Sequence, residues 1–328
     1  MARSGTPPCG VFYVTDSGFI LPTIVSAVQL RSKVPTTEAD IHVIAVDLDQ
    51  AVFDRVKAHL ALSHIELWAM DAATFTGFDL AEFNQTHVPY ATLGRFFMLD
   101  RVPQRYDHIL YLDGDTWIDG DPLPLIRYSP PPGRFAAAEG PSFYFRNDVT
   151  AYGRWTREYL QGLGLTVDDG YFNAGVFSVD YDTWKAIAKE AFDFFLANTQ
   201  RCPYHDESAL NAVCQHRRVR LSPEWNYNTP YRFWGVERAV RPQIYHFTGG
   251  PKPWAVRQFP WADQYDPYQK AFAALSDLGL TMKPESIGGW SKMRNRFQWL
   301  QLRTVMLPRL QNRQRDVADV IASSVALG

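Results

Sequence analysis

Short apolar runs alternate with segments of helical spacing in the N-terminal part of the chain. Residues 11–15, 41–47 and 65–70 have the composition of buried strands, and residues 20–32 and 53–62 carry apolar side chains every three or four positions. Strands that alternate with such helices are typical of a mostly parallel sheet covered by helices. The pattern therefore predicts an α/β fold.

The alternation continues, with longer gaps, through residue 279. In open α/β sheets, ligands bind beyond the carboxyl ends of the strands, so polar residues that follow a strand are candidates for a site. The remaining expected helices are 90–102, 183–199, 206–216 and 266–279, and the expected strands are 108–113, 133–140, 171–180 and, running into a Gly/Pro loop, 243–254.

Composition is that of an ordinary soluble globular protein. Of the 328 residues, 46% are hydrophobic and 21% are charged, which suits one α/β domain with an appended segment. No run of eighteen apolar residues predicts a membrane span, and residues 1–14 lack the apolar stretch of a signal peptide. The three cysteines include no C-x-x-C pair, so we expect free thiols and a reducing compartment.

The sequence ILYLDGDTWID (residues 109–119) places acids directly after a buried strand. Asp113 and Asp115 form a D-G-D pair, and uncompensated carboxylates beside a core are costly. Either they lie in a solvated turn, which Asp and Gly favour, or they hold a hard divalent cation. Because His246 also follows an expected strand, we favour the cation.

Spacing tests other metal and phosphate sites. An EF-hand loop that begins at Asp113 needs an oxygen ligand and then Gly at its fifth and sixth positions, where this chain has Trp117 and Ile118. A strand-D-x-D-x-T/V phosphohydrolase also disagrees at Trp117, but it stays open as a Mg²⁺-dependent alternative. The first strand is not followed by G-x-G-x-x-G, and the chain has no P-loop and no G-x-S-x-G, which disfavours dinucleotide, P-loop and serine-hydrolase sites.

Five motifs, in order along residues 10–255, resemble glycosyltransferase family 8, which includes glycogenin and bacterial lipopolysaccharide galactosyl- and glucosyltransferases. They are YLDGDTWIDGDPLPL, YFNAGVFSVDYDTW, YHDESALNAV, WNYN and YHFTGGPKPW. The resemblance implies a GT-A fold, with a Rossmann-like, mostly parallel central sheet flanked by helices. It also implies a UDP-sugar donor (UDP-glucose or UDP-galactose), a Mn²⁺ ion and retention of the anomeric configuration.

The resemblance assigns a metal site and a donor site. Asp113, Asp115 and His246 match the family's metal ligands, and this donor set suits Mg²⁺ or, because of the imidazole, Mn²⁺ better. The ion would bridge the diphosphate and neutralise charge as UDP leaves. Donor contacts are implied for Thr15, Asp16, Arg95, Gly114, Asn173, Ala174, Gly175, Asp206, Gly249 and Lys252.

Residue chemistry agrees with these contacts and also allows structural roles. Asp16 can accept hydrogen bonds from the base or ribose, or cap the next helix. Asp206 can hold sugar hydroxyls, or cap a helix in the same way. The Arg95 guanidinium suits an oxyanion, and Gly249 with Lys252 offers backbone N–H groups and a positive charge to a phosphate.

Glu207 departs from the family pattern, which often has Gln after the aspartate that corresponds to Asp206. A carboxylate beneath the anomeric carbon can form a covalent glycosyl-enzyme intermediate or stabilise positive charge. We expect Asp206, Glu207 and Arg95 to form the catalytic group.

Positive charge concentrates near the C-terminus. Residues 290–315 contain seven cations and no acid, so the rest of the chain, whose total net charge is −2, carries −9. Apolar residues recur there at three- and four-residue steps, which predicts a basic amphipathic helix that Pro308 ends or kinks. Such a helix binds an anionic membrane surface, or packs on the domain with its cations in water. The acidic remainder disfavours nucleic acid as a partner.

These patterns predict a catalytic domain at 1–260 and a helical region at 261–328. We expect a cytoplasmic, metal-dependent retaining hexosyltransferase, held at the inner face of the plasma membrane through residues 290–315. Its expected substrates are a UDP-sugar and a glycan or glycolipid such as the lipopolysaccharide core. The alternatives are the phosphohydrolase and a family member that binds nucleotide-sugar or glycan without turnover.

Overall fold

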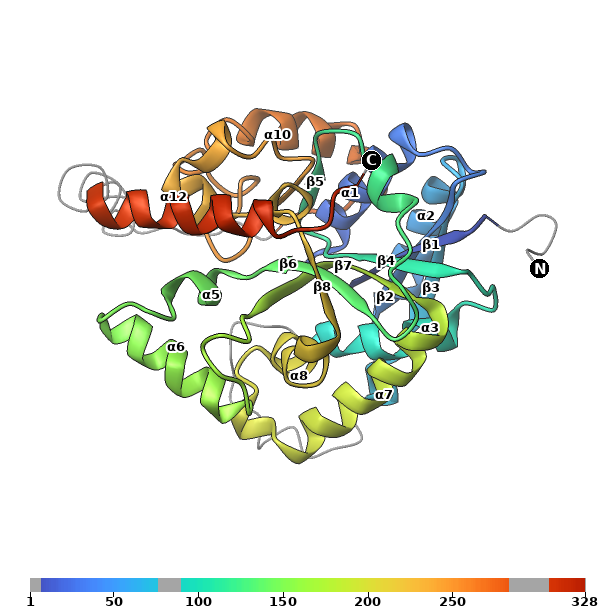
Figure 1. The fold of residues 1–328 in the computed structure, drawn as a ribbon. Helices are drawn as coiled ribbons and strands as arrows, with labels where there is room; N and C mark the ends of the chain where they lie inside the picture. The colour runs from blue at the N-terminus through green and yellow to red at the C-terminus, as the bar shows by residue number, and fades with distance from the viewer. Residues whose placement is uncertain (1–6, 76–89, 283–306, 328) are drawn as a thin grey trace.

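A seven-stranded sheet runs through the centre of the protein (Figure 1). The computed structural model describes residues 7–75, 90–282 and 307–327, and its large sheet has the strand order β3-β2-β1-β4-β7-β6-β8. All neighbouring strands are parallel except that β7 runs antiparallel to β4 and β6. The strands are β1 (Cys9–Thr15), β2 (Ala39–Val46), β3 (Ile65–Met70), β4 (His108–Leu112), β6 (Phe135–Glu139), β7 (Phe172–Asp180) and β8 (Arg218–Leu221).

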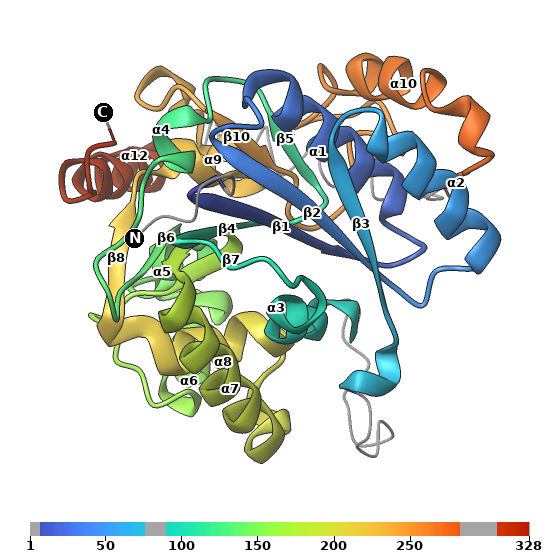
Figure 2. The same ribbon diagram turned by 90° about the vertical axis from the view of Figure 1, so that its right-hand side faces the viewer.

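Helices cover both faces of this sheet (Figure 2). Helices α1, α2 and α10 lie on one side, and α3, α6, α7 and α8 lie on the other. This arrangement confirms the predicted α/β fold, and it explains why the interior strand β1 is buried along its whole length. The helices are α1 (Ile20–Lys33), α2 (Gln50–Ala61), α3 (Met98–Arg101), α6 (Ala151–Gly162), α7 (Tyr181–Ala197), α8 (His205–Cys214) and α10 (Tyr265–Ala273).

A second sheet of three short strands, in the order β5-β10-β9, lies on the α1 side. Strand β5 (Thr116–Ile118) follows β4 after a three-residue turn and pairs antiparallel with β10 (Ile244–His246). Strand β9 (Tyr227–Asn228) pairs parallel with β10. These pairings connect the end of β4 to segments more than one hundred residues later in the chain.

The reversed direction of β7 decides which residues meet at the carboxyl edge. Because β7 runs antiparallel to β4, its first residues lie beside the last residues of β4, with Leu112 opposite Val176. The backbone N–H of Asp113 donates to the carbonyl of Gly175 over 2.8 Å. Motifs about sixty residues apart in the sequence therefore share one edge of the sheet.

The predicted helix at 90–102 differs in type from what we expected. Residues Tyr90–Phe97 form a 3-10 helix, and only Met98–Arg101 are α-helical. The 3-10 segment packs closely on the strands, because a Cβ at Gly94 would lie 3.0 Å from Val14 Cγ1 and 3.1 Å from Met70 Sδ. Gly94 thus lets the segment pack against both Val14 and Met70, and this tight packing accompanies the i→i+3 hydrogen bonds of the 3-10 helix.

The C-terminal helix α12 (Leu307–Ala322) packs against the domain (Figure 1). Pro308 lies in the first turn of α12, where its missing N–H has no intrahelical partner to lose, and an end or kink of the preceding basic helix at Pro308 stays a prediction. Residues 290–306 of the predicted basic helix lie outside the described residues. Val317 and Val320 are buried, and Val325 pairs with the edge of β8 at Leu221. Within the described parts of the chain, none of the helices is long and apolar enough to cross a bilayer.

Candidate active site

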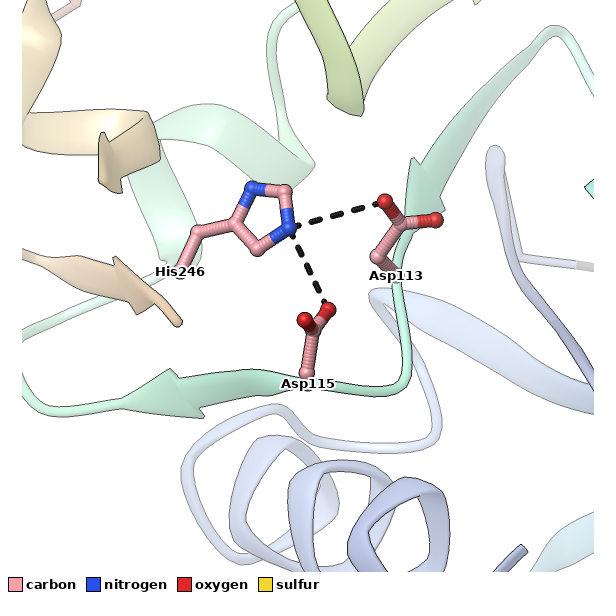
Figure 3. Close-up of side chains that lie close together, drawn as sticks. All are labelled: Asp113, Asp115 and His246. Atoms are coloured by element: carbon pink, nitrogen blue, oxygen red, sulfur yellow. Dashed lines mark ion pairs between the residues drawn. The ribbon is translucent and has the colours of Figure 1, made fainter. Parts of the chain in front are cut away.

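Three potential metal ligands meet where β4, β5 and β10 come together (Figure 3). Asp113 follows β4, Asp115 precedes β5, and His246 is the last residue of β10. His246 Nε2 lies 3.2 Å from Asp115 Oδ1 and 3.6 Å from Asp113 Oδ2. One ligand atom from each residue lies within 4.8 Å of the other two. Two carboxylates and one imidazole are a donor set that fits Mn²⁺.

Gly175 makes room for this cluster. A Cβ at this position would lie 2.1 Å from His246 Cε1 and 2.6 Å from Asp113 Oδ2. No side chain can therefore stand at residue 175 without displacing two of the three candidate ligands. We expected Gly175 to contact the donor, and the structure adds this steric reason for the glycine.

The cluster favours positive charge between its carboxylates. Burial raises the pKa of Asp115, but Lys252 and His246 outweigh that effect, so this pKa lies well below its usual range. Burial lowers the pKa of His246, but Asp115 and Asp113 raise it more, so the net shift is upward. Either a proton on the imidazole or a bound divalent cation would place positive charge beside the two carboxylates.

Lys252 supports Asp115 from the other side. Its Nζ lies 2.6 Å from Asp115 Oδ2 and donates to the carbonyl of Phe247 over 2.6 Å. The ammonium group therefore contacts a candidate metal ligand directly, in the Gly/Pro loop after β10. A contact of Lys252 with a diphosphate stays a prediction.

Arg95 joins the metal cluster to a second acid. Its Nη2 donates to Asp113 Oδ1 over 2.9 Å, and its Nη1 lies 3.0 Å from Asp206 Oδ2 and 2.9 Å from the Ala174 carbonyl oxygen. Burial lowers the pKa of Arg95, but Asp206, Tyr111 and Asp113 raise it further than burial lowers it. Arg95 is 2% exposed, so its first role in this structure is to hold the two acids in place.

The backbone is strained where α8 begins. His205 has a φ of 43°, in the left-handed region that a residue with a Cβ occupies at a cost of about 1–3 kcal/mol. The next two residues are Asp206 and Glu207, in the first turn of α8, where the helix dipole favours negative charge. The capping role considered for Asp206 is absent, because the cap position is Tyr204 and no side chain caps this helix.

Glu207 accepts three hydrogen bonds. Its Oε1 accepts from the Tyr171 hydroxyl at 2.8 Å, and its Oε2 accepts from Asn173 Nδ2 at 2.7 Å and from the Ala174 N–H at 3.1 Å. Burial raises the pKa of Glu207 to about 7, although the bonds from Tyr171 and Ala174 lower it and the charge of Asp206 raises it again. The side chain is therefore fixed in orientation and titrates near neutrality.

The residues at the end of β1 have local partners. Asp16 Oδ1 accepts from the N–H groups of Gly18 at 2.8 Å and Phe19 at 3.1 Å, at the entrance to α1. The alternative that Asp16 caps the next helix is wrong, because the cap position of α1 is Phe19 and no side chain caps this helix. Asp16 instead holds the turn before α1, and its contact with a base or ribose stays a prediction. The Thr15 hydroxyl accepts from Thr23 Oγ1 at 3.0 Å and is buried.

Gly114 and Gly249, both predicted to contact the donor, are glycines for different structural reasons. A Cβ at Gly114 would lie 2.1 Å from Thr23 Oγ1, so the turn between the two acids packs against α1 without room for a side chain. Gly249 has a φ of 70°, which favours glycine, and it lies on the surface beyond β10. Gly114 follows β4 and Gly249 follows β10, so the backbone of both lies near the strand ends where the candidate ligands meet.

Three buried side chains that hold the site were not predicted. Tyr171 donates to Glu207, and Tyr111 donates to Asp113 Oδ1 over 3.0 Å. Asn226 lies between His246 of the metal cluster and Asn173, which contacts Glu207. Each stands within or beside a quoted motif, but nothing in its spacing distinguishes it from a core residue. Their roles depend on side-chain contacts between distant segments.

Comparison with known proteins gives the class of protein. Residues 10–257 match the family model described as glycosyl transferase family 8. The chain therefore belongs to this family of glycosyltransferases.

Several curated proteins resemble the chain in sequence. General stress protein A of Bacillus subtilis is 30% identical over 34% of this chain and 45% of its own length. Lipopolysaccharide 1,3-galactosyltransferase of Salmonella typhimurium is 26% identical over 50% of this chain and 49% of its own length. Lipopolysaccharide glucosyltransferase WaaO of Escherichia coli is 22% identical over 80% of this chain and 76% of its own length. The chain thus spans about half the length of the first two relatives.

A solved structure supports the fold. The galactosyltransferase LgtC, in complex with donor and acceptor sugar analogs, has a TM-score of 0.64 and 21% sequence identity, over 84% of this chain and 98% of that chain. At this identity the likeness concerns the fold, and it agrees with the helix-flanked sheet described above.

Proposed function

We propose that this protein is a divalent-metal-dependent, retaining hexosyltransferase that moves glucose or galactose from a UDP-sugar to a glycan acceptor. The observation that carries the proposal is the convergence of Asp113, Asp115 and His246, with ligand atoms within 4.8 Å of one another, beside the Arg95–Asp206 pair. Membership of glycosyl transferase family 8 supports the reaction class.

Asp113, Asp115 and His246 would hold the metal, with Mn²⁺ favoured over Mg²⁺ by the imidazole. The bound ion would neutralise the negative charge of the departing diphosphate. Lys252 lies at the same edge, and the residues after β10 supply backbone N–H groups near the surface. Thr15 and Asp16, at the end of the neighbouring strand β1, are proposed to border the nucleoside.

Asp206 and Glu207 are proposed to face the donor sugar. Arg95 holds the Asp206 carboxylate, which then accepts hydrogen bonds from sugar hydroxyls. Glu207 is held by donors from Tyr171, Asn173 and Ala174, and its carboxylate stabilises positive charge at the anomeric carbon, as a nucleophile or as a fixed anion. A carboxylate placed in this way is compatible with retention of configuration.

The acceptor proposed here is a glycan of the lipopolysaccharide core. Two relatives are named as lipopolysaccharide hexosyltransferases, and one of them matches 80% of this chain. Residues 290–315 are proposed to bring the protein to the cytoplasmic face of the membrane, where such an acceptor would lie. Arg313 does not serve this role, because it is buried and pairs with Asp148 at 2.6 Å, whereas the packed-helix alternative expected its cations in water.

The test is release of UDP from a panel of UDP-sugars, with and without Mn²⁺ and with purified lipopolysaccharide core as acceptor. The proposal predicts UDP release that requires metal, favours UDP-glucose or UDP-galactose, and rises strongly with acceptor. Release of inorganic phosphate would instead identify a phosphohydrolase, and binding of the nucleotide-sugar without any release would identify a binding protein.

A further inference from the structure

The buried side chain of Asn226 lies between the metal cluster and Glu207. Asn226 ends the short 3-10 helix Pro223–Asn226, directly before β9, and it is 0% exposed. Its Oδ1 lies 2.9 Å from His246 Nδ1, and its Nδ2 lies 2.8 Å from Asn173 Oδ1 and 3.3 Å from the Asn173 carbonyl oxygen.

Backbone groups decide the orientation of Asn173. The N–H of Gly175 can only donate, and it points at Asn173 Oδ1 over 3.1 Å. Turning the amide over would set an NH₂ group against this N–H and a carbonyl oxygen against the carboxylate of Glu207. The Nδ2 of Asn173 therefore faces Glu207 Oε2, at 2.7 Å.

The same reasoning then settles Asn226 and His246. The atom of Asn226 that faces Asn173 meets two acceptors, a side-chain and a backbone oxygen, so it is the NH₂ group. The oxygen of Asn226 consequently faces His246 Nδ1, which must be the donor. When the imidazole is neutral, its proton lies on Nδ1 and the lone pair of Nε2 faces the two aspartates.

We propose that Asn226 is a positioning residue both for the metal cluster, through His246, and for Glu207, through Asn173. Its carbonyl oxygen holds His246 in the Nδ1–H tautomer, which leaves Nε2 free to bind a divalent cation, and its NH₂ group holds the Asn173 amide that donates to Glu207. The part that concerns the cation rests on the proposed function, whereas the tautomer is a property of the protein itself. A hydrogen bond to the ring nitrogen that does not bind metal is a general means of orienting a histidine ligand.

The tautomer is measured directly by ¹⁵N NMR of the histidine rings in metal-free wild-type protein, in alkaline buffer that leaves the rings neutral. Comparison with His246→Gln assigns the signals. The inference predicts a protonated Nδ1 and an unprotonated Nε2 at His246. A protonated Nε2 with an unprotonated Nδ1 would overturn it, and this measurement requires no substitution of Asn226.

Mn²⁺ titration calorimetry then separates the two functions of the amide. Asn226→Ala removes both contacts and is expected to weaken Mn²⁺ binding about 10- to 100-fold. Asn226→Asp keeps an acceptor for His246 and adds negative charge, so its Mn²⁺ affinity should equal or exceed that of wild type. The lost donor to Asn173 should still lower its kcat for UDP release at saturating Mn²⁺.

Asn211→Ala is the matched control. Asn211 is also 0% exposed and makes three hydrogen bonds, to Phe172 N, Phe172 O and the Glu207 carbonyl, but none to His246. Its loss should lower stability and leave Mn²⁺ affinity unchanged. If Asn226→Ala binds Mn²⁺ as tightly as Asn211→Ala, the positioning role is wrong. If wild type binds no Mn²⁺ at all, the proposed function fails instead. The ¹⁵N NMR measurement of the His246 tautomer would then still test whether Asn226 positions His246.

Discussion

Arg95 Nη1 lies 3.0 Å from Asp206 Oδ2, in an ion pair whose side chains are only 3% and 4% exposed. The other terminal nitrogen of the same guanidinium donates to Asp113, a candidate metal ligand. One buried cation thus fixes the distance between the proposed metal site and the proposed sugar site.

The first prediction concerns the stability that this pair provides. Arg95→Ala leaves two acids without their partner, so it should lower the free energy of unfolding by about 3–5 kcal/mol, measured by urea denaturation. The control is Arg105→Ala, which removes an exposed ion pair with Asp182 and should cost less than about 1 kcal/mol. Equal losses in the two variants would show that the Arg95 pairs add nothing beyond a surface contact.

The second prediction concerns how Glu207 links stability to pH. Its pKa is about 7 in the folded protein, against a usual value of 4.5. Between these pH values the folded protein binds more protons than the unfolded chain, so stability should fall as pH rises through this window. Glu207→Gln should remove this dependence in urea denaturation, whereas Glu158→Gln, at an exposed position on α6, should keep it.

The third prediction is the corresponding effect on activity. The groups around Glu207 are Tyr171, Asn173, the Ala174 N–H and the charges of Asp206 and Asp113. If the carboxylate form stabilises positive charge, UDP release should rise as pH passes about 7, and Glu207→Gln should be about 100-fold slower with no such rise. Near-equal rates for Glu207→Gln and wild type would rule out covalent catalysis by this residue.

Local patterns in the sequence were sufficient to place the strand ends. Asp113 follows a short apolar run and His246 ends one, and both were expected to lie at strand ends near each other, as the structure shows. The parallel-strand rule is not the reason for their proximity, because β10 belongs to the small sheet and pairs antiparallel with β5. The expected strand at 65–70 matches β3 residue for residue. These features depend on side-chain periodicity over five to ten residues, which a single sequence displays.

Other features depend on contacts that no local pattern encodes. The antiparallel direction of β7 brings Asn173 and Gly175 to the site, and the apolar run of that strand is the same for either direction. Arg95 was predicted to contact the donor, but its pairing with Asp113 and Asp206, which come from two other segments, was not.

The fourth prediction concerns residues 290–306. Truncation is a poor test, because α12 contributes Val317 and Val320 to the core. Replacing the four cations before α12 with glutamine should instead weaken binding to anionic phosphatidylglycerol vesicles by about 1 kcal/mol per cation, measured by cosedimentation. A control variant with glutamine at four exposed cations elsewhere should bind as wild type; equal weakening of both would mean that only total charge matters. The replaced residues are Lys292, Arg294, Arg296 and Arg303, and the controls are Lys57, Lys185, Lys189 and Arg201.

The fifth prediction concerns the space beside Gly175. Gly175→Ala places a methyl group 2.1 Å from His246 Cε1, so it should abolish measurable Mn²⁺ binding in calorimetry while the protein still folds. Gly162→Ala, on α6, meets no atom within 4 Å and should leave Mn²⁺ binding unchanged, with stability raised by about 0.5–1 kcal/mol. Unaltered Mn²⁺ affinity in Gly175→Ala would place the metal elsewhere.

The most direct test of the central claim is an anomalous difference map from a crystal soaked with Mn²⁺ and UDP. We expect a single strong manganese peak bounded by Asp113, Asp115 and His246, with the diphosphate of UDP beside it. A map with no peak among these three side chains, or with UDP bound away from them, would contradict it.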